Sequence, residues 1–198
     1  MRPDLEIICE WIKPGSNVLD LGCGDGTLLK HLSETRDIKG IGIEIDNDNI
    51  VACVKRGVDV IQADLDKGLA GYFSRCKFDY VVMTQTLQAV HHPAWVLDEM
   101  LKVGKESIVT FPNMGYWKNR WQLFFKGTMP VTRVLPSQWF DTENIHLCTI
   151  RDFESLCVDN GLRVIERATV DHAHRDSFGI RLLPNLMGEI ALYRITRR

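Results

Sequence analysis

The stretch "VLDLGCGDG", residues 18–26, governs how the rest of this chain is interpreted. An apolar run around one acid, Asp20, leads into three glycines at alternate positions, and a second acid, Asp25, stands before the last glycine. A short apolar run that ends in glycine is typical of a buried strand followed by a tight turn. Because such a turn lets a ligand approach the main chain closely, the stretch predicts a strand that ends at a binding site.

The sequence on either side repeats the alternation of strand and helix. Apolar runs without polar alternation are typical of strands buried on both faces, and strands that alternate with helices form a mainly parallel sheet. The chain ends in two segments that are predicted to close the sheet as an antiparallel pair. The predicted fold is therefore α/β and Rossmann-like, with a seven-stranded sheet and helices on both faces. Strands are expected at 17–22, 38–46, 58–65, 78–85, 107–111, 163–170 and 189–196, and helices at 26–36, 47–57, 94–104 and 149–162.

Two of these helices have a defined apolar face. Leu28, Leu29 and Leu32 share one side of the first helix. In the helix at 94–104, the residues expected to face inward are Trp95, Leu97, Met100 and Leu101.

Length and composition narrow the class of protein. The 198 residues, 45% of them apolar, are enough for a single domain over residues 1–198. The formal charge of −2 does not favour nucleic-acid binding, and no run of about 18 apolar residues predicts a membrane span. The six cysteines form no C-x-x-C pair, so no metal site is predicted. Without a secretory signal, we expect reduced thiols and a cytoplasmic location.

The charges around the glycine turn distinguish between two nucleotide ligands. A dinucleotide fingerprint is G-x-G-x-x-G, whereas the spacing here is one residue shorter, and Asp20 and Asp25 would repel a pyrophosphate. S-adenosylmethionine has an ammonium and a sulfonium but no phosphate. Asp20 or Asp25 can complement that cation, Glu44 at the end of the second strand can accept the ribose hydroxyl hydrogens, and Asp64 ends the third strand, where the amino group of the adenine would lie.

Four stretches in succession resemble the motifs of class I S-adenosylmethionine-dependent methyltransferases: "VLDLGCGDG", "GIGIEID", "QADL" and "FDYVVMTQTLQAV". The resemblance covers about residues 15–112 and resumes in the C-terminal helix and hairpin. It implies S-adenosylmethionine, or S-adenosylhomocysteine, as cofactor. The expected cofactor-binding residues are Asp20, Gly22, Cys23, Gly24, Asp25, Gly26, Glu44, Ile45, Asp64, Leu65 and Thr84.

Simpler interpretations of several of these residues stay open. Asp25 is also the kind of acid that a helix N-terminus favours, and Asp64 is also a common turn residue. Cys23 is interpreted as a small residue that fills the turn rather than as a nucleophile.

The residues after the fourth strand bear on catalysis, for which no residue is assigned. Many methyltransferases of small molecules have a Leu-Glu-His-Val-like stretch there, whereas this chain has Gln88 and Ala89 in place of the acid and the imidazole. His91 and His92 follow and are alternatives as a base, although a turn before Pro93 is the simpler role for them.

The second half of the chain is similar to the MetW family of methionine-biosynthesis proteins. The similarity rests on "FPNMGYWKNRWQLFFKGTMPVT" and "WFDTENIHLCTIRDFE", together with "DLEIICEWIKPGSNVLDLGCGDGTLL" at the start. It implies a methyltransferase fold that works beside homoserine O-acyltransferase and supports or activates that enzyme. A free-standing methyltransferase of a small molecule is the alternative, and a pure interaction protein is the third.

An aromatic-rich insertion or cap is expected at about 113–145. Trp117, Trp121, Phe124 and Phe125 have the spacing of one helical stripe. Packing of the stripe on the sheet edge over the cofactor is one interpretation, a partner-binding surface is the second, and a membrane-surface helix or RNA stacking are others. His146 precedes the next helix, where relatives place a residue near the sulfur of the cofactor, but a capping or core role is equally open.

Overall fold

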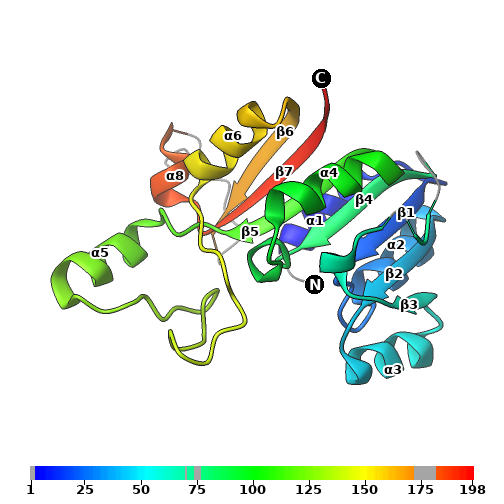
Figure 1. Ribbon diagram of the computed structural model, residues 1–198, viewed down its shortest axis with the longest axis horizontal. Coiled ribbons are helices and arrows are strands. Elements are labelled where there is room, and N and C mark those ends of the chain that lie inside the picture. Colours follow the sequence, from blue (N-terminus) through cyan, green and yellow to red (C-terminus); the bar gives the residue numbers. More distant parts are fainter. Residues whose placement is uncertain (1–2, 70, 74–76, 172–181) are drawn as a thin grey trace.

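A computed structural model describes residues 3–69, 71–73, 77–171 and 182–198. Seven strands form one sheet in the order β3-β2-β1-β4-β5-β7-β6, in which β7 runs antiparallel to both of its neighbours and the other pairs are parallel (Figure 1). The strands are β1 (Asn17–Leu21), β2 (Lys39–Glu44), β3 (Val60–Gln62), β4 (Phe78–Thr84), β5 (Gly104–Pro112), β6 (Leu162–Val170) and β7 (Ile190–Arg197).

Helices cover both faces of the sheet, and each face has its own apolar core. One core joins the sheet to α4 and α6, and the other joins it to α1, α2 and α3. The helices are α1 (Pro3–Trp11), α2 (Thr27–Arg36), α3 (Asn47–Arg56), α4 (Pro93–Val103), α5 (Trp117–Lys126), α6 (Ile150–Asp159) and α8 (Pro184–Met187), with short 3₁₀ turns η1 (Leu65–Lys67) and η2 (Leu87–Ala89).

The predicted strands and their directions are confirmed, with differences at the ends. The third strand is shorter than expected, because the chain turns at Asp64 into η1. The fifth strand is longer and begins at Gly104, where it pairs with Phe78. On α2, Leu28, Leu29 and Leu32 are buried as expected.

The inward orientation expected for Trp95 is wrong, because its side chain is 39% exposed. The buried stripe of α4 is centred on Val96, Leu97 and Met100, so Trp95 lies at the margin of that stripe. Its ring lies over Gly68 instead, where an added Cβ would come within 2.9 Å of the indole.

One N-terminal helix was not anticipated. Leu5, Ile8, Cys9 and Ile12 are buried, and their i, i+3, i+4, i+7 spacing is the signal that could have predicted α1. Because α1 packs on the sheet beside the glycine turn, it becomes part of the candidate site.

Residues 113–145, called the arm below, project from the end of β5 and carry α5 away from the sheet (Figure 1). One interpretation of the sequence was that the aromatic stripe of α5 packs on the sheet edge over the cofactor. That interpretation is wrong, because the stripe is exposed. Trp121 is 58% exposed and Phe124 is 82% exposed, and Trp139 farther along the arm is 74% exposed. The aromatic residues contact each other, for example Trp121 and Phe125 with ring centres 4.0 Å apart.

No helix within the described residues is long and apolar enough to cross a membrane.

Candidate functional site

The glycine turn has a backbone that side chains would disturb. Gly22, Gly24 and Gly26 all have positive φ angles, of 68°, 54° and 77°. A Cβ at Gly22 would lie 2.6 Å from the hydroxyl oxygen of Thr86, whereas the space beside Gly24 is open. The middle of the turn therefore presents bare main chain to its surroundings, as a ligand cradle requires.

Glu44, the last residue of β2, holds this turn in place. The residue is buried, with 8% of its surface exposed, and Oε2 of its carboxylate accepts the Gly24 N–H at 2.8 Å. The other oxygen, Oε1, accepts the N–H groups of Ile45 at 2.8 Å and Asp46 at 3.0 Å. Because a carboxylate has about four acceptor positions, these three bonds leave one position on Oε2.

Asp25 is bound within the protein. Its carboxylate accepts the hydroxyl and the backbone N–H of Thr27, at 2.7 and 3.1 Å, and forms an ion pair with Arg56 at 2.9 Å. The Thr27 hydroxyl, followed by the backbone bond and the Arg56 guanidinium, lowers the pKa of Asp25 despite its partial burial. These contacts at the start of α2 support the helix-terminus interpretation of this residue.

Two adjoining clefts lie at the carboxyl ends of the strands, on either side of Gly22, and have volumes of about 600 and 580 Å³. This edge is the topological switch point, since β1 lies between β2 and β4. We call the two clefts the turn cleft and the β3 cleft. The turn cleft is lined by Leu5, Asp20, Gly22, Cys23, Gly24, Asp25, Thr27, Leu28, Thr84 and Gln85. The β3 cleft is lined by Gly22, Ile43, Glu44, Ile45, Ala63, Asp64, Leu65, Asp66, Lys67, Thr86, Ala89, Val90 and His91.

Ten of the eleven residues expected to bind the cofactor line one of these clefts. Gly26 is the exception, because it faces α3: a Cβ there would lie 2.9 Å from the Cys53 thiol. Asp20 is almost fully buried at the floor of the turn cleft. Asp64 caps η1 by accepting the Asp66 N–H at 3.0 Å, so its turn role is present alongside its position in the cleft.

Asp66 and His91 form a pair that the sequence did not reveal. The Asp66 carboxylate lies 2.7 Å from Nδ1 of His91 and accepts the His91 backbone N–H at 2.9 Å. Burial acts to raise the pKa of Asp66, but the bonds from the His91 ring and backbone outweigh it and lower the pKa. His91 thus borders the β3 cleft, and His92 occupies the N-cap position of α4.

Cys23 fills space, as expected. Its thiol is buried 3.8 Å from the Cys53 thiol and would contact a side chain placed at Gly42. Burial, together with nearby Asp20, raises the pKa of Cys23 strongly, and burial also raises the pKa of Cys53. A thiol held in its neutral form is a poor nucleophile.

The segment after β4 turns its polar groups inward. Gln85 has a positive φ of 53°, and its side chain reaches Asp4 of α1 at 3.3 Å. Gln88 is buried: its amide donates to the Gln85 carbonyl at 2.5 Å. The backbone carbonyl of Gln88 accepts the His146 backbone N–H at 2.9 Å, so the loop that contains His146 packs on η2.

His146 has an exposed side chain that lies 3.2 Å from the His91 carbonyl oxygen. Local sequence carries no signal for the contact of His146 with His91 or for that of Gln85 with Asp4, because the partners are 55 and 81 positions apart. Among the described residues, no group of three or more potential metal ligands is present.

Comparisons with known proteins agree with this fold. The family model described as "Methionine biosynthesis protein MetW" matches residues 2–195. A curated relative, the bifunctional methionine biosynthesis protein MetXA/MetW of Rhodopirellula baltica, is 38% identical over 165 residues, which are 79% of this chain. That match covers 26% of the relative, so the chain spans about a quarter of its length.

Solved structures of S-adenosylmethionine-dependent methyltransferases superpose on nearly the whole chain. One from Thermotoga maritima has a TM-score of 0.67 and 19% identity, over 99% of this chain and 88% of that one. Another from Mesorhizobium loti has a TM-score of 0.68 and 17% identity, over 98% of this chain and all of that one. The fold is that of the class I methyltransferases, and at these identities the likeness concerns the fold alone.

Proposed function

Because the chain belongs to the MetW family of methionine biosynthesis proteins, we propose that it binds S-adenosylmethionine or S-adenosylhomocysteine and supports homoserine O-acyltransferase as its partner. The observation that carries the cofactor proposal is the gathering of the expected residues around Gly22, on two clefts that meet at the switch point of the sheet.

The chemistry of the clefts fits such a cofactor. Asp20 in the turn cleft offers a carboxylate to the cationic methionine end, beside the exposed main chain of Gly24. Glu44 has one acceptor position left for a ribose hydroxyl, because its other positions hold backbone N–H groups. Ile45 and Leu65 provide apolar surface in the β3 cleft for the adenine, next to Asp64.

Calorimetry with S-adenosylhomocysteine tests this proposal. The isolated protein binds the nucleoside but not NAD, whose pyrophosphate would meet Asp20 and Asp25. Glu44→Ala weakens binding by about 1.5–3 kcal/mol, the value of a hydrogen bond to a charged acceptor. Asp48→Ala, which removes an exposed acid from the first turn of α3, is the control. Equal affinity of the Glu44 variant and the control would remove Glu44 from the site.

Methyl transfer by the isolated protein is expected to be slow. The Gln88 side chain is an amide, which is not a base, and it is buried and donates to the Gln85 carbonyl. His91 lies with Asp64 and Asp66 in the β3 cleft, at the end assigned to the adenine rather than to the methyl group. Labelled S-adenosylmethionine with a broad set of small acceptors measures this. Rapid turnover of any acceptor would favour the alternative, a free-standing methyltransferase.

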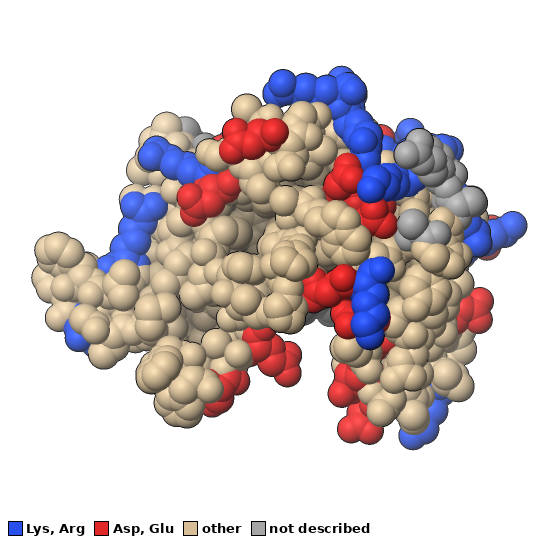
Figure 2. Space-filling model, viewed as in Figure 1, with Lys and Arg blue, Asp and Glu red and all other residues tan. Residues whose placement is uncertain are grey.

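The partner proposal combines the fused relative with the exposed arm. MetXA and MetW functions are named together for the Rhodopirellula baltica protein, so the two activities occur there in one chain. On the face shown in Figure 2, uncharged surface makes up most of the arm, with basic side chains along its upper edge and acidic ones at its lower end. Aromatic side chains exposed to this extent are unusual on a free surface and are typical of interface anchors.

A double variant, Trp117→Ala/Trp121→Ala, separates an interface from a structural role. Both side chains are exposed, so the melting temperature of the isolated protein changes little. The double variant binds purified homoserine acyltransferase from the same organism more weakly than the parent protein does. The increase in activity or stability that the acyltransferase gains from this protein is reduced as well. Trp95→Ala, an exposed tryptophan outside the arm, is the matched control. Normal support of the acyltransferase by a stable double variant would contradict the arm as the contact surface.

The two proposals can be coupled. If the cofactor binds the free and the acyltransferase-bound forms with different affinity, it changes the affinity for the acyltransferase by the same factor. Titration of S-adenosylhomocysteine into the protein with and without the acyltransferase measures this factor directly. Equal affinities would leave both binding events intact but independent of one another.

A further inference from the structure

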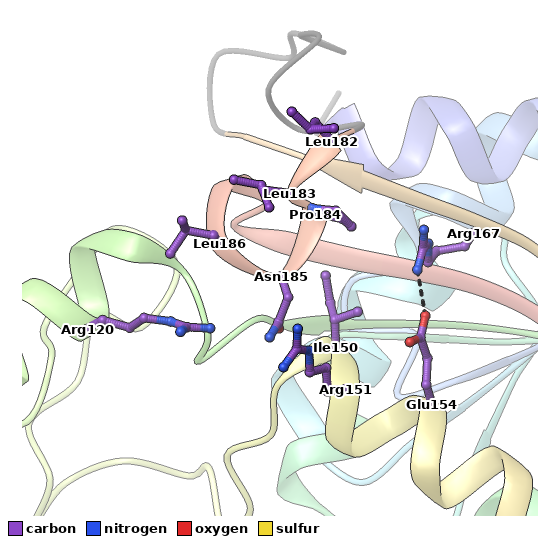
Figure 3. Close-up of a pocket in the computed structure, with 10 residues that line it drawn as sticks. All are labelled: Arg120, Ile150, Arg151, Glu154, Arg167, Leu182, Leu183, Pro184, Asn185 and Leu186. Carbon is purple, nitrogen blue, oxygen red and sulfur yellow. Dashed lines mark hydrogen bonds and ion pairs between the residues drawn. The ribbon is translucent and has the colours of Figure 1, made fainter.

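A third cavity lies where the arm meets the C-terminal part of the sheet, away from the glycine turn (Figure 3). It has a volume of about 340 Å³ and shares none of its described lining residues with the other two clefts. The residues that line it come from α5, α6, β6 and the segment leading through α8: Arg120, Ile150, Arg151, Glu154, Arg167, Leu182, Leu183, Pro184, Asn185 and Leu186.

The cavity is positively charged in a chain whose overall charge is −2. Glu154 is already neutralised, because its Oε1 lies 2.7 Å from Arg167 and accepts the Tyr193 hydroxyl at 3.0 Å. Arg120 uses its Nε to donate to the Gly115 carbonyl. Within the described residues, neither Arg120 nor Arg151 forms an ion pair.

The fold holds these two arginines near each other. Asn113, buried at the end of β5, accepts the Ile150 N–H through Oδ1 and donates through Nδ2 to the Asn185 and Gly188 carbonyls. This one side chain therefore joins the start of α6, which carries Arg151, to α8. Figure 3 shows Arg120 extending from α5 toward the side chains of Asn185 and Arg151, which lie together.

The lining indicates the class of ligand. A guanidinium presents planar pairs of N–H donors that match carboxylate or phosphoryl oxygens. Ile150, Leu183 and Pro184 form an apolar wall beside the arginines. The volume lies at the lower end of the range for small-molecule sites. We propose that this cavity binds a small organic anion, with its carboxylate or phosphoryl group between Arg120 and Arg151 and its aliphatic part against that wall.

Binding of simple probes to the purified full chain tests the proposal without any cofactor or enzyme assay. Butanoate and inorganic phosphate are titrated at low ionic strength, with butylamine as a probe that has the same number of carbon atoms but the opposite charge. The anions bind and butylamine does not, and the tighter of the two anions identifies the carboxylate or the phosphoryl class. Arg120→Gln and Arg151→Gln each weaken binding about tenfold.

Arg163→Gln is the matched control, because it removes the same charge from an exposed position of β6 outside the cavity. It leaves anion binding unchanged. Because Arg120 and Arg151 are exposed, their variants keep the melting temperature of the parent protein, and they bind S-adenosylhomocysteine as the parent does. Unchanged anion affinity in both variants, equal binding of butylamine, or no binding of either anion at millimolar concentration would overturn the proposal.

Discussion

Replacing Glu44 tests whether one carboxylate holds the glycine turn together. Glu44→Ala removes the acceptor of three backbone N–H groups, those of Gly24, Ile45 and Asp46. Hydrogen bonds to a charged group contribute about 1.5–3 kcal/mol each. We take the lower value because the clefts admit water that can solvate the freed N–H groups. The expected loss of stability is then about 4–5 kcal/mol, or roughly 10–15 °C in melting temperature for a chain of this length.

Glu44→Gln is the more selective variant. Its amide oxygen can still accept the N–H groups of Ile45 and Asp46, but its NH₂ group faces the Gly24 N–H, so one bond is lost. The expected cost is about 2 kcal/mol. Urea denaturation of the two variants, with Asp48→Ala as the control, measures both values. A Glu44→Ala protein as stable as the control would refute the idea that this carboxylate organises the turn, whatever its effect on ligand affinity.

Other consequences of the local geometry can be measured in the isolated protein. Gly26→Ala is destabilising, because a Cβ at φ 77° would also approach the Cys53 thiol to 2.9 Å; thermal melting measures the loss, and an unchanged melting temperature would contradict the packing. The lowered pKa of Asp66 stabilises the fold above the pKa of the unfolded carboxyl, near 3.9, and this contribution is lost as pH falls through the folded pKa. Asp66→Asn therefore loses less stability than the parent protein when the pH falls from about 6 to about 3. Cys23, with its pKa raised by burial, reacts with iodoacetamide at about pH 8 much more slowly than it does in urea, and equal rates would refute its burial.

Local pattern predicted the fold because each strand carries its own signal. Runs such as "YVVM", and "VLDL" apart from Asp20, are apolar on both faces of the strand, and this pattern is sufficient to indicate strands covered by helices. For the aromatic stripe of α5 the sequence left several interpretations open, and the one in which the stripe packs on the sheet edge was wrong. The aromatic spacing of α5 correctly indicated a helix, yet periodicity identifies only which residues share a face and not what that face contacts. Only the tertiary structure shows that the aromatic face of α5 is exposed.

The residues of the candidate site divide in the same way. The acids Asp20, Glu44 and Asp64 could be assigned from sequence, because parallel strands bring their carboxyl ends to one edge and each acid lies at or just beyond such an end. The pairing of Asp66 with His91 and the cavity between Arg120 and Arg151 could not be predicted from sequence. The two residues of each pair are 25 and 31 positions apart, and they meet through loops and helix ends whose paths are set by long-range packing rather than by local propensity. The sequence by itself determined the sheet and the acids along its edge, whereas only tertiary structure decided which side chains meet across that edge.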